Sequence, residues 1–392
     1  MKILVLAWEF PPRIVGGISR HVAELYPELV NLGHEIHLLT VEFGQAPRYE
    51  EVEGLRVHVS ESHNFFHWIA NMNESMGQHG GKLLLEDGPF DIIHAHDWLV
   101  GDAAIALKRI FKVPLVATIH ATEYGRHNGI YNDTHRYIHG KETNLVAEAW
   151  RVIVCTNYMR LEVERALHSP WDKIDVVYNG ISVEKREPSP EFEYWQFRRR
   201  FATDKEKIVY YVGRMTYEKG VNLLLSAAPK VIWEMGGDAK FVIIGGGNLD
   251  PLKHQAWNLG IRDKCYFTGF MPEDDLNQFR LVADCAVFPS LYEPFGIVAL
   301  ESFAARVPVV VSDTGGLPEV VRQGKTGVVT RAGNPDSIAW GIVEILKNPD
   351  YANWLVENAY EDLDIRFNWY KLAQQTEGVY GRILHERSDA EW

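Results

Sequence analysis

Apolar and polar positions alternate in blocks along the first half of the chain. Short apolar runs occupy residues 2–7, 34–41, 91–96, 114–120, 151–156 and 173–180. Longer amphipathic stretches separate them, such as residues 19–33, which have the spacing of a helix that buries one side. Strand-length runs separated by helices are typical of βαβ units in a parallel sheet. The pattern therefore predicts a doubly wound α/β domain.

A second series of the same kind follows a break in the pattern. Residues 184–206 are rich in charge and proline, which indicates a linker and one short helix. Apolar runs then return at residues 207–214, 240–247, 265–270, 285–290, 307–313 and 326–330. We predict two Rossmann-like domains, residues 1–190 and 191–371, that face a central cleft. An aromatic-rich helix over about 372–392 is expected to pack back on the first domain.

Composition narrows the classes of function. The 392 residues carry a net charge of −13, which argues against a nucleic-acid or anionic-lipid surface, although a local basic patch stays open. The helix expected at 19–32 has Arg20 as its one full cation beside Glu24 and Glu28, which speaks against membrane docking. The three cysteines form no C-x-x-C pair, so no disulfide framework or thiolate zinc site is expected. The first apolar run is too short for a signal peptide, and we expect a cytoplasmic protein.

Several polar and glycine residues lie where the predicted strands end. They are Gly16-Gly17, residues 94–98, His120, Gly213-Arg214, residues 245–247 and Glu293. Ligands of open parallel sheets bind beyond the carboxyl ends of the strands. Arg214 and Lys219 could neutralise a diphosphate there, or they could be solvated residues of a surface turn. Neither glycine-rich segment fits G-x-G-x-x-G, so a nicotinamide or flavin enzyme remains only a minor alternative.

The segment HAHDW, residues 94–98, allows two interpretations. On a strand, His94 and His96 share a face, and together with Asp97 they could bind zinc or iron. Because no further clustered ligands are evident, we favour polar strand-end residues, with Asp97 and Trp98 facing a sugar. His120 is a lone histidine, a type that is more often structural, but it ends an apolar strand at the same edge.

The segment EPFGIVALE places Glu293 and Glu301 eight positions apart around a Pro-Phe-Gly turn. A plain interpretation is the beginning of a helix, with Glu301 as a residue of an early turn. The alternative is that free amides at the helix N-terminus meet an anion while the two carboxylates bind hydroxyls.

Together these segments resemble retaining glycosyltransferases of family 4, which are related to bacterial glycogen synthases and sucrose-phosphate-synthase-like glucosyltransferases. The resemblance runs through nearly the whole chain and is carried by residues 8–22, 94–98, 212–220, 290–304 and 312–321. The E-x7-E element, Glu293 to Glu301, is its most specific part. The resemblance implies the GT-B architecture.

The resemblance also implies roles for individual residues. Glu301 would bind the ribose of the donor nucleotide, and Glu293 would bind hydroxyls of the donor sugar. Arg214 and Lys219 would neutralise the leaving diphosphate, and His120 would contact the sugar near the reacting carbon. The remaining implied donor contacts are Gly16, Gly17, Gly213, Phe295, Gly296, Ile297 and Val298. Similar enzymes retain anomeric configuration without a protein nucleophile, and no metal or other cofactor is expected.

The acceptor is expected at the first domain, near Asp97, Trp98, Tyr124, Arg126 and His127. The leading hypothesis is transfer of a hexosyl unit, glucose first, from UDP- or ADP-glucose to a soluble sugar, a sugar phosphate or an α-glucan. Other readings are a nucleotide-sugar epimerase or hydrolase, a lipid- or polysaccharide-directed transferase, and a silent nucleotide-sugar binder.

Overall fold

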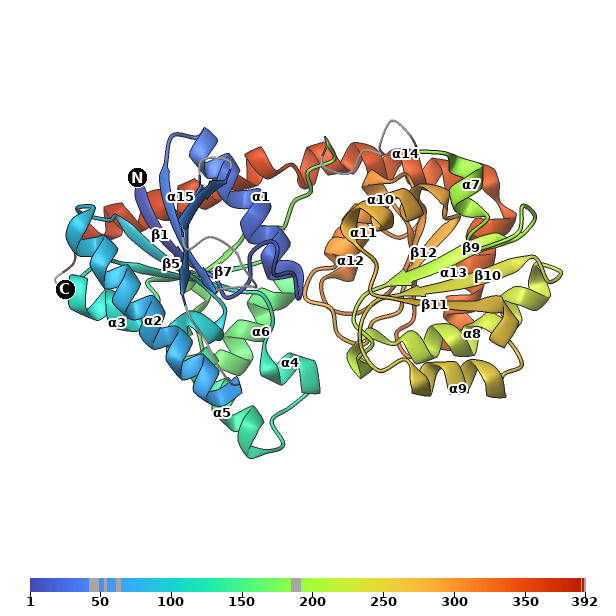
Figure 1. Ribbon diagram of the computed structural model, residues 1–392, viewed down its shortest axis with the longest axis horizontal. Coiled ribbons are helices and arrows are strands. Elements are labelled where there is room, and N and C mark those ends of the chain that lie inside the picture. Colours follow the sequence, from blue (N-terminus) through green and yellow to red (C-terminus); the bar gives the residue numbers. More distant parts are fainter. Residues whose placement is uncertain (42–48, 53–54, 61–64, 185–191, 389, 391–392) are drawn as a thin grey trace. The chain divides into compact units, whose positions relative to one another are not determined.

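The computed structural model describes residues 1–41, 49–52, 55–60, 65–184, 192–388 and 390. The chain forms two compact units (Figure 1). Unit 1 comprises Met1–Gly180 and Asn368–Trp392, and unit 2 comprises Ile181–Phe367. The domain boundaries predicted from the sequence, after residues 190 and 371, both lie further along the chain than these two unit boundaries.

Unit 1 is built on one eight-stranded sheet in the order β3-β4-β2-β1-β5-β6-β7-β8. Every neighbouring pair is parallel except β3 and β4. The strands are β1 (Lys2–Leu6), β2 (Glu35–Val41), β3 (Tyr49–Val52), β4 (Leu55–Ser60), β5 (Ile92–His96), β6 (Leu115–Ile119), β7 (Arg151–Val154) and β8 (Ile174–Val176). In the centre of the sheet, Ile3 is in register with Ile36 of β2 and Ile92 of β5.

Helices cover both faces of this sheet (Figure 1), which explains why β5 and β6 in its centre are buried along their whole length. The helices are α1 (Gly17–Asn31), α2 (Phe65–Glu86), α3 (Gly101–Phe111), α4 (Glu123–His127), α5 (Asp133–Glu148), α6 (Asn157–Leu167) and α15 (Trp369–Ser388). Two short 3₁₀ helices, η1 (Trp98–Val100) and η2 (Trp171–Lys173), join them. Figure 1 shows α15, in red, returning along α1, and Trp369 and Tyr380 of α15 lie in one core with Tyr26 of α1. The C-terminal helix thus belongs to the core of unit 1.

Unit 2 is built on a parallel six-stranded sheet in the order β11-β10-β9-β12-β13-β14. Its strands are β9 (Lys207–Val212), β10 (Ala239–Ile244), β11 (Cys265–Gly269), β12 (Cys285–Phe288), β13 (Val309–Ser312) and β14 (Val328–Thr330). Its helices are α7 (Tyr194–Arg198), α8 (Val221–Glu234), α9 (Asp250–Asn258), α10 (Glu273–Val282), α11 (Ile297–Ala304), α12 (Leu317–Val320), α13 (Pro335–Lys347) and α14 (Pro349–Arg366), with 3₁₀ helices η4 (Tyr217–Lys219) and η5 (Arg262–Lys264). Figure 1 shows α8 and α9 on one side of this sheet and α10 and α11 on the other.

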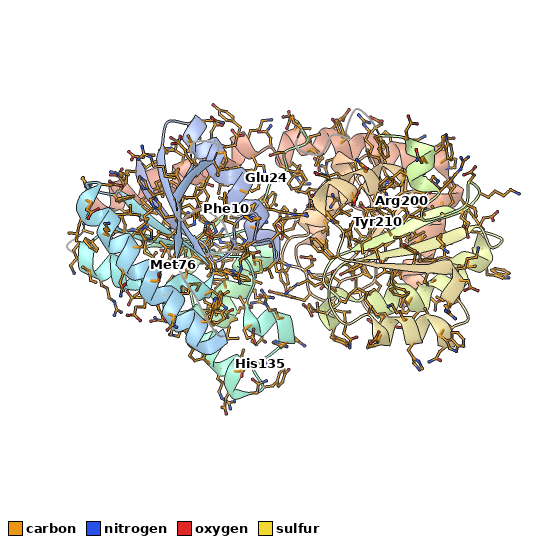
Figure 2. The ribbon with its side chains drawn as sticks, viewed as in Figure 1. Phe10, Glu24, Met76, His135, Arg200 and Tyr210 are labelled. Atoms are coloured by element: carbon orange, nitrogen blue, oxygen red, sulfur yellow. The ribbon has the colours of Figure 1, made fainter. Side chains whose placement is uncertain are left out.

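Aromatic side chains fill the interior of unit 2. Tyr210, labelled in Figure 2, is completely buried, and its ring meets Phe279 of α10 and Phe288 of β12 edge-on. Arg200, also labelled there, lies on the surface. Such edge-to-face contacts stabilise the interior beyond what burial of the ring area contributes.

The structure confirms the fold class and the two predicted series of parallel strands, since each apolar run overlaps one strand. The antiparallel pair β3–β4 and helix α2 were not predicted, and β3 reads YEEV, which has no apolar run. The predicted short helix is α7, whereas residues 185–191 of the predicted linker lie outside the described residues. Within the described chain, no helix combines the length and apolar character needed to cross a bilayer.

Candidate active site

The loops that follow β9, β12 and β13 meet at the carboxyl edge of the sheet in unit 2. The carbonyl of Glu218 accepts the amides of Leu291 and Tyr292 at 2.7 and 3.2 Å. The hydroxyl of Thr314 donates to the carbonyl of Leu291 at 3.1 Å, and the amide of Gly316 donates to the carbonyl of Glu293 at 2.8 Å. The segments that carry the predicted donor residues are therefore joined through their backbones.

Two glycines allow these backbones to approach each other. Gly315 has φ +60°, and a Cβ there would lie 2.0 Å from the carbonyl oxygen of Glu293. Gly245 has φ +142°, and its Cβ would lie 1.8 Å from the carbonyl oxygen of Gly213. Neither distance is compatible with a side chain, so both positions require glycine.

Lys219 and Glu293 form an ion pair at this edge. Lys219 Nζ donates to Glu293 Oε2 at 2.8 Å, and the two side chains are 19% and 13% exposed. Arg214 is more open, with 48% of its side chain exposed, and its Nη2 lies 3.7 Å from Glu218 Oε1. Burial, with the carboxylates of Glu293 and Glu218 nearby, raises the pKa of Tyr211 far above its usual value. Tyr211 therefore stays a neutral donor to the carbonyl of Arg214 at 2.9 Å.

Helix α11 begins beside this pair. Gly296 is its N-cap residue, with φ +102°, and no side chain caps the first turn. The amides that open an α-helix have no partner within it, and they carry the positive end of the helix dipole. Phe295 is buried against Phe367 at a ring-centroid distance of 6.1 Å, which anchors the turn. Ile297 and Val298 thus present a helix N-terminus suited to an anion.

Glu301 lies in an environment that the sequence did not foresee. It is completely buried, and its Oε2 accepts from Arg280 Nη2 at 2.5 Å. Arg280, on α10, is itself buried and also donates to Asn277 Oδ1 at 2.8 Å. No local pattern singles out Arg280, because its partner is 21 positions away on another helix. The ribose contact of Glu301 stays a prediction.

In unit 1 the predicted residue His120 ends a row of hydrogen-bonded side chains. Its Nε2 lies 3.0 Å from Nδ1 of His96, and Nε2 of His96 lies 2.6 Å from the hydroxyl of Tyr26. His94 lies 2.9 Å from the same hydroxyl through Nδ1 and 2.7 Å from the Thr118 hydroxyl through Nε2. His94 and His96 do share a strand face, with rings stacked at 4.6 Å, but both are completely buried.

His21 completes this cluster, and sequence reasoning missed it. Its Nδ1 lies 2.7 Å from Asn179 Oδ1, and its ring lies 4.9 Å from that of His120. Burial lowers the pKa of His21 to about 4 and that of His94 to about 3. Burial and the neighbouring imidazoles also lower the pKa of His96 and of His120 well below the usual value. These imidazoles are therefore neutral at pH 7.

The hypothesis that His94 and His96 bind a metal ion can be compared with these contacts. Both nitrogens of His94 contact hydroxyl groups, which accounts for that ring without an ion. Ligand atoms of His21, His96 and His120 do lie within 4.8 Å of one another. Three neutral imidazoles suit zinc in principle. The hydrogen bonds that join His96 with His120 and with Tyr26 account for this arrangement as well.

The predicted acceptor residues lie next to this cluster or on α4. Asp97 has φ +61°, and its Oδ1 accepts the amide of His120 at 2.7 Å. Burial, with Glu9 nearby, raises the pKa of Asp97 to about 7, and the charge of Arg126 opposes this rise. Trp98 meets Tyr137 edge-on at 6.4 Å.

Helix α4 carries the other predicted acceptor residues, of which Tyr124 and His127 are exposed. His127 stacks on His135 at 4.0 Å and lies 3.3 Å from Glu123. Glu123, His127 and His135 are a second group with metal-ligand chemistry.

Glu9 holds the glycine turn that the sequence assigned to phosphate. Its Oε2 accepts the amides of Val15 and Gly16, both at 2.8 Å, and its side chain is buried. The amide of Gly16 is thus bound by a protein carboxylate, while Gly17 begins α1. The one feature of the sequence that could have identified Glu9 is its position just after the first strand.

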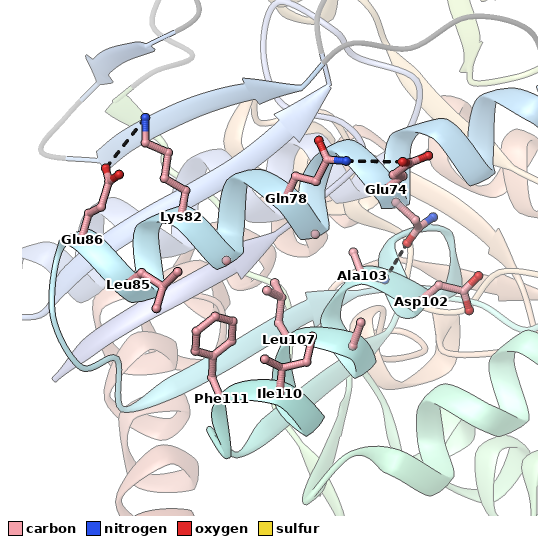
Figure 3. Close-up of a pocket in the computed structure, with 14 residues that line it drawn as sticks. Glu74, Gln78, Lys82, Leu85, Glu86, Asp102, Ala103, Leu107, Ile110 and Phe111 are labelled. Atoms are coloured by element: carbon pink, nitrogen blue, oxygen red, sulfur yellow. Dashed lines mark hydrogen bonds and ion pairs between the residues drawn. The ribbon is translucent and has the colours of Figure 1, made fainter.

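Two cavities lie away from the predicted residues. A groove of about 740 Å³ runs between α2 and α3, where Figure 3 shows Leu85, Leu107, Ile110 and Phe111 along its floor and sides. A pocket of about 730 Å³ in unit 2 is lined by Trp257, Tyr266 and several cations. None of the residues predicted for the active site lines either one.

Two family models match the chain, one in each half. The model described as Glycosyltransferase Family 4 matches residues 15–185, and the model described as Glycosyl transferases group 1 matches residues 193–362. An uncharacterized glycosyltransferase of Methanocaldococcus jannaschii is 39% identical over 387 residues, covering 97% of this chain and 98% of the relative. A glycogen synthase of Mycobacterium tuberculosis is 34% identical over 399 residues, covering 97% of this chain and 94% of the relative.

The fold is also found among solved structures. Sucrose-phosphate synthase from Thermosynechococcus elongatus has a TM-score of 0.84 at 21% identity, covering 98% of this chain and 99% of that chain. The two parallel-sheet units and this likeness confirm the GT-B fold class.

Proposed function

We propose that this chain, a transferase that belongs to glycosyltransferase family 4, moves a hexosyl unit from a nucleoside diphosphate sugar to a carbohydrate acceptor with retention of configuration. Glucose is the sugar proposed first, with UDP or ADP as carrier. The acceptor would be a soluble sugar, a sugar phosphate or an α-glucan. The likeness to a glycogen synthase and to a sucrose-phosphate synthase supports this choice.

The observation that carries the proposal is the charged edge of unit 2. Arg214, the pair Lys219–Glu293 and the uncapped N-terminus of α11 occur together at the carboxyl ends of parallel strands. A nucleoside diphosphate carries charge that suits these cations and the amides of Ile297 and Val298. Its arrival would draw Lys219 from Glu293 and free that carboxylate to accept sugar hydroxyls.

The chemistry then rests on stabilising the leaving group. The bond between the anomeric carbon and the diphosphate oxygen breaks as Arg214 and Lys219 neutralise the developing charge. The acceptor hydroxyl bonds to the same face of that carbon, and its proton passes to the departing phosphate oxygen. Attack on the same face gives retention, and no protein nucleophile is required. The proposal assigns the ribose to Glu301, further donor contacts to Gly17 and Gly213, and a sugar contact to His120.

The acceptor is proposed to bind at unit 1. Asp97, Trp98 and the α4 residues Tyr124, Arg126 and His127 offer a carboxyl, aromatic rings and a guanidinium to sugar hydroxyls or a phosphate. The mechanism uses no metal or other cofactor.

A donor-by-acceptor screen tests the proposal. UDP-, ADP- and GDP-glucose are each incubated with fructose 6-phosphate, glucose 1-phosphate, maltooligosaccharides and glycogen, and nucleoside diphosphate release is followed. We expect release that depends on one acceptor, with an α-linked product by NMR. Release without acceptor would identify a hydrolase, a changed donor sugar an epimerase, and binding without release a silent binder.

A further inference from the structure

A continuous row of hydrogen-bonding groups leads from His120 into the core of unit 1. His120 Nε2 lies 3.0 Å from His96 Nδ1, and His96 Nε2 lies 2.6 Å from the Tyr26 hydroxyl. Beyond Tyr26, His94 Nδ1 lies 2.9 Å from that hydroxyl and 2.6 Å from the hydroxyl of Tyr380. His94, His96, Tyr26 and Tyr380 have no exposed surface, so water cannot replace these partners.

The partners of His96 limit the protonation of His120. A neutral imidazole carries one proton, so each ring donates through one nitrogen and accepts through the other. If Tyr26 donates to His96 Nε2, then His96 donates from Nδ1 to His120 Nε2, and His120 keeps its proton on Nδ1. If the direction is reversed, His120 carries its proton on Nε2 and Nδ1 is bare.

The acidities of the groups favour the first direction. A phenol has an ordinary pKa near 10 and is a better proton donor than a neutral imidazole, whose nitrogen is the better acceptor. The short contact between Tyr26 and His96 therefore has the hydroxyl donating. His120 is also held from its backbone, because its amide donates to Asp97 Oδ1 at 2.7 Å.

We propose that Tyr26 and His96 are positioning residues that fix the ring of His120 and keep its proton on Nδ1, so that it offers a hydrogen-bond donor to an oxygen of the donor sugar. This role rests on the sugar contact proposed above for His120. The pair acts through His120 and touches no substrate itself. The same logic orients the histidine ligands of metal sites, where the second ring nitrogen decides the tautomer.

The variants Tyr26→Phe, His96→Leu and His96→Asn separate positioning from packing. Phenylalanine removes the hydroxyl alone, and leucine removes both ring nitrogens. Asparagine restores an amide donor near the place of His96 Nδ1, so it should rescue. His37→Leu is the matched control, because His37 is also a buried strand histidine, paired with His58 at 3.2 Å, at a distance from this row along the sheet.

Two readouts on the full-length protein test the proposal. The nitrogen-15 shifts of His120, measured without substrate, should show the proton on Nδ1 in the unaltered protein and in His96→Asn, and a mixture of tautomers in Tyr26→Phe and His96→Leu. With the acceptor found in the screen, we expect kcat to fall about tenfold in Tyr26→Phe and more in His96→Leu, with donor Kd unchanged. His96→Asn should stay within about threefold of the unaltered protein, and His37→Leu should leave kcat unchanged.

Some results would overturn the positioning role. A His120 proton on Nε2 in the unaltered protein, or a tautomer that neither variant alters, rejects it. So does a loss of kcat that matches the fall in Tm across all variants, His37→Leu included. If no donor and acceptor pair reacts, the proposed function fails, while the nitrogen-15 shifts still decide whether Tyr26 and His96 set the tautomer.

Discussion

The carboxyl edges of the two sheets differ in the charge of the side chains that line them. In unit 2 the edge is ionic, with Lys219 and Glu293 paired at 2.8 Å and Arg214 half exposed beside them. In unit 1 the clustered histidines are neutral, because burial lowers their pKa, and burial raises the pKa of Asp97 to about 7. A pair of charges suits a ligand that brings its own charge, whereas neutral donors and acceptors suit sugar hydroxyls.

The means of positioning differ as well. Unit 2 brings backbone against backbone, which the glycines at 245 and 315 permit. Unit 1 uses side chains instead, since His96 contacts the ring of His120 and Tyr26 contacts His96 in turn. A substitution in unit 2 should therefore act through charge or backbone geometry. In unit 1 it should act through protonation.

The largest expected effect is the loss of a cation from unit 2. Lys219→Ala should lower kcat/KM by about 10²- to 10³-fold, because it removes charge that stabilises the leaving diphosphate. Steady-state kinetics with the donor and acceptor from the screen measures this. Lys230→Ala is the control, since Lys230 also forms an ion pair in unit 2, with Asp336 at 2.9 Å on exposed helices. Equal activity of the two variants would remove Lys219 from the site.

The next largest effect is expected at the close backbone contact between Gly315 and Glu293 in unit 2. Gly315→Ala should lower the free energy of unfolding by about 3 kcal/mol and reduce donor affinity, since its Cβ would displace the carbonyl of Glu293. Gly236→Ala is matched to it, because Gly236 has φ +65° and open space around its Cβ. That variant should cost only about 1 kcal/mol, for the left-handed backbone. Urea unfolding and donor titration compare them, and equal costs would mean that the contact with Glu293 relaxes freely.

The sequence predicted what lies along one strand and the loop after it. Arg214, Lys219 and Glu293 follow β9 and β12 directly, so locating the strands was enough to bring them to one edge. The shared face of His94 and His96 follows from strand periodicity in the same way. Signals of this kind depend on neighbours in the chain.

Contacts between distant segments gave no such signal. Strand β1 lies beside β5, and helix α1 follows β1 in the chain, so α1 starts near the ends of β5 and β6. His21 of α1 therefore contacts His96 and His120. Arg280 reaches Glu301 from another helix. Each is a single residue in a helical stretch with no periodic pattern to reveal it, so only the packed structure identifies its partner.

The last expected effect is on stability, and it tests whether Asp97 of unit 1 is held as a neutral carboxyl group. Because the pKa of Asp97 rises from 3.8 to about 7 on folding, the folded state holds a proton that the unfolded chain has lost between those pH values. The contribution of Asp97 to the stability of the wild type therefore falls as pH rises from about 4 to 7, at up to about 1.4 kcal/mol per pH unit. Asp97→Asn keeps an acceptor for the amide of His120 and suits the backbone at φ +61°.

The stability gained by Asp97→Asn over the wild type should accordingly grow between pH 4 and 7, by about 3 kcal/mol, and then level off. Urea unfolding at a series of pH values measures it. Asp336→Asn, at an exposed position on α13, is the control for the same substitution outside unit 1. A gain that shrinks with rising pH would mean that Asp97 is held as a carboxylate, and the edge of unit 1 would then be charged like that of unit 2.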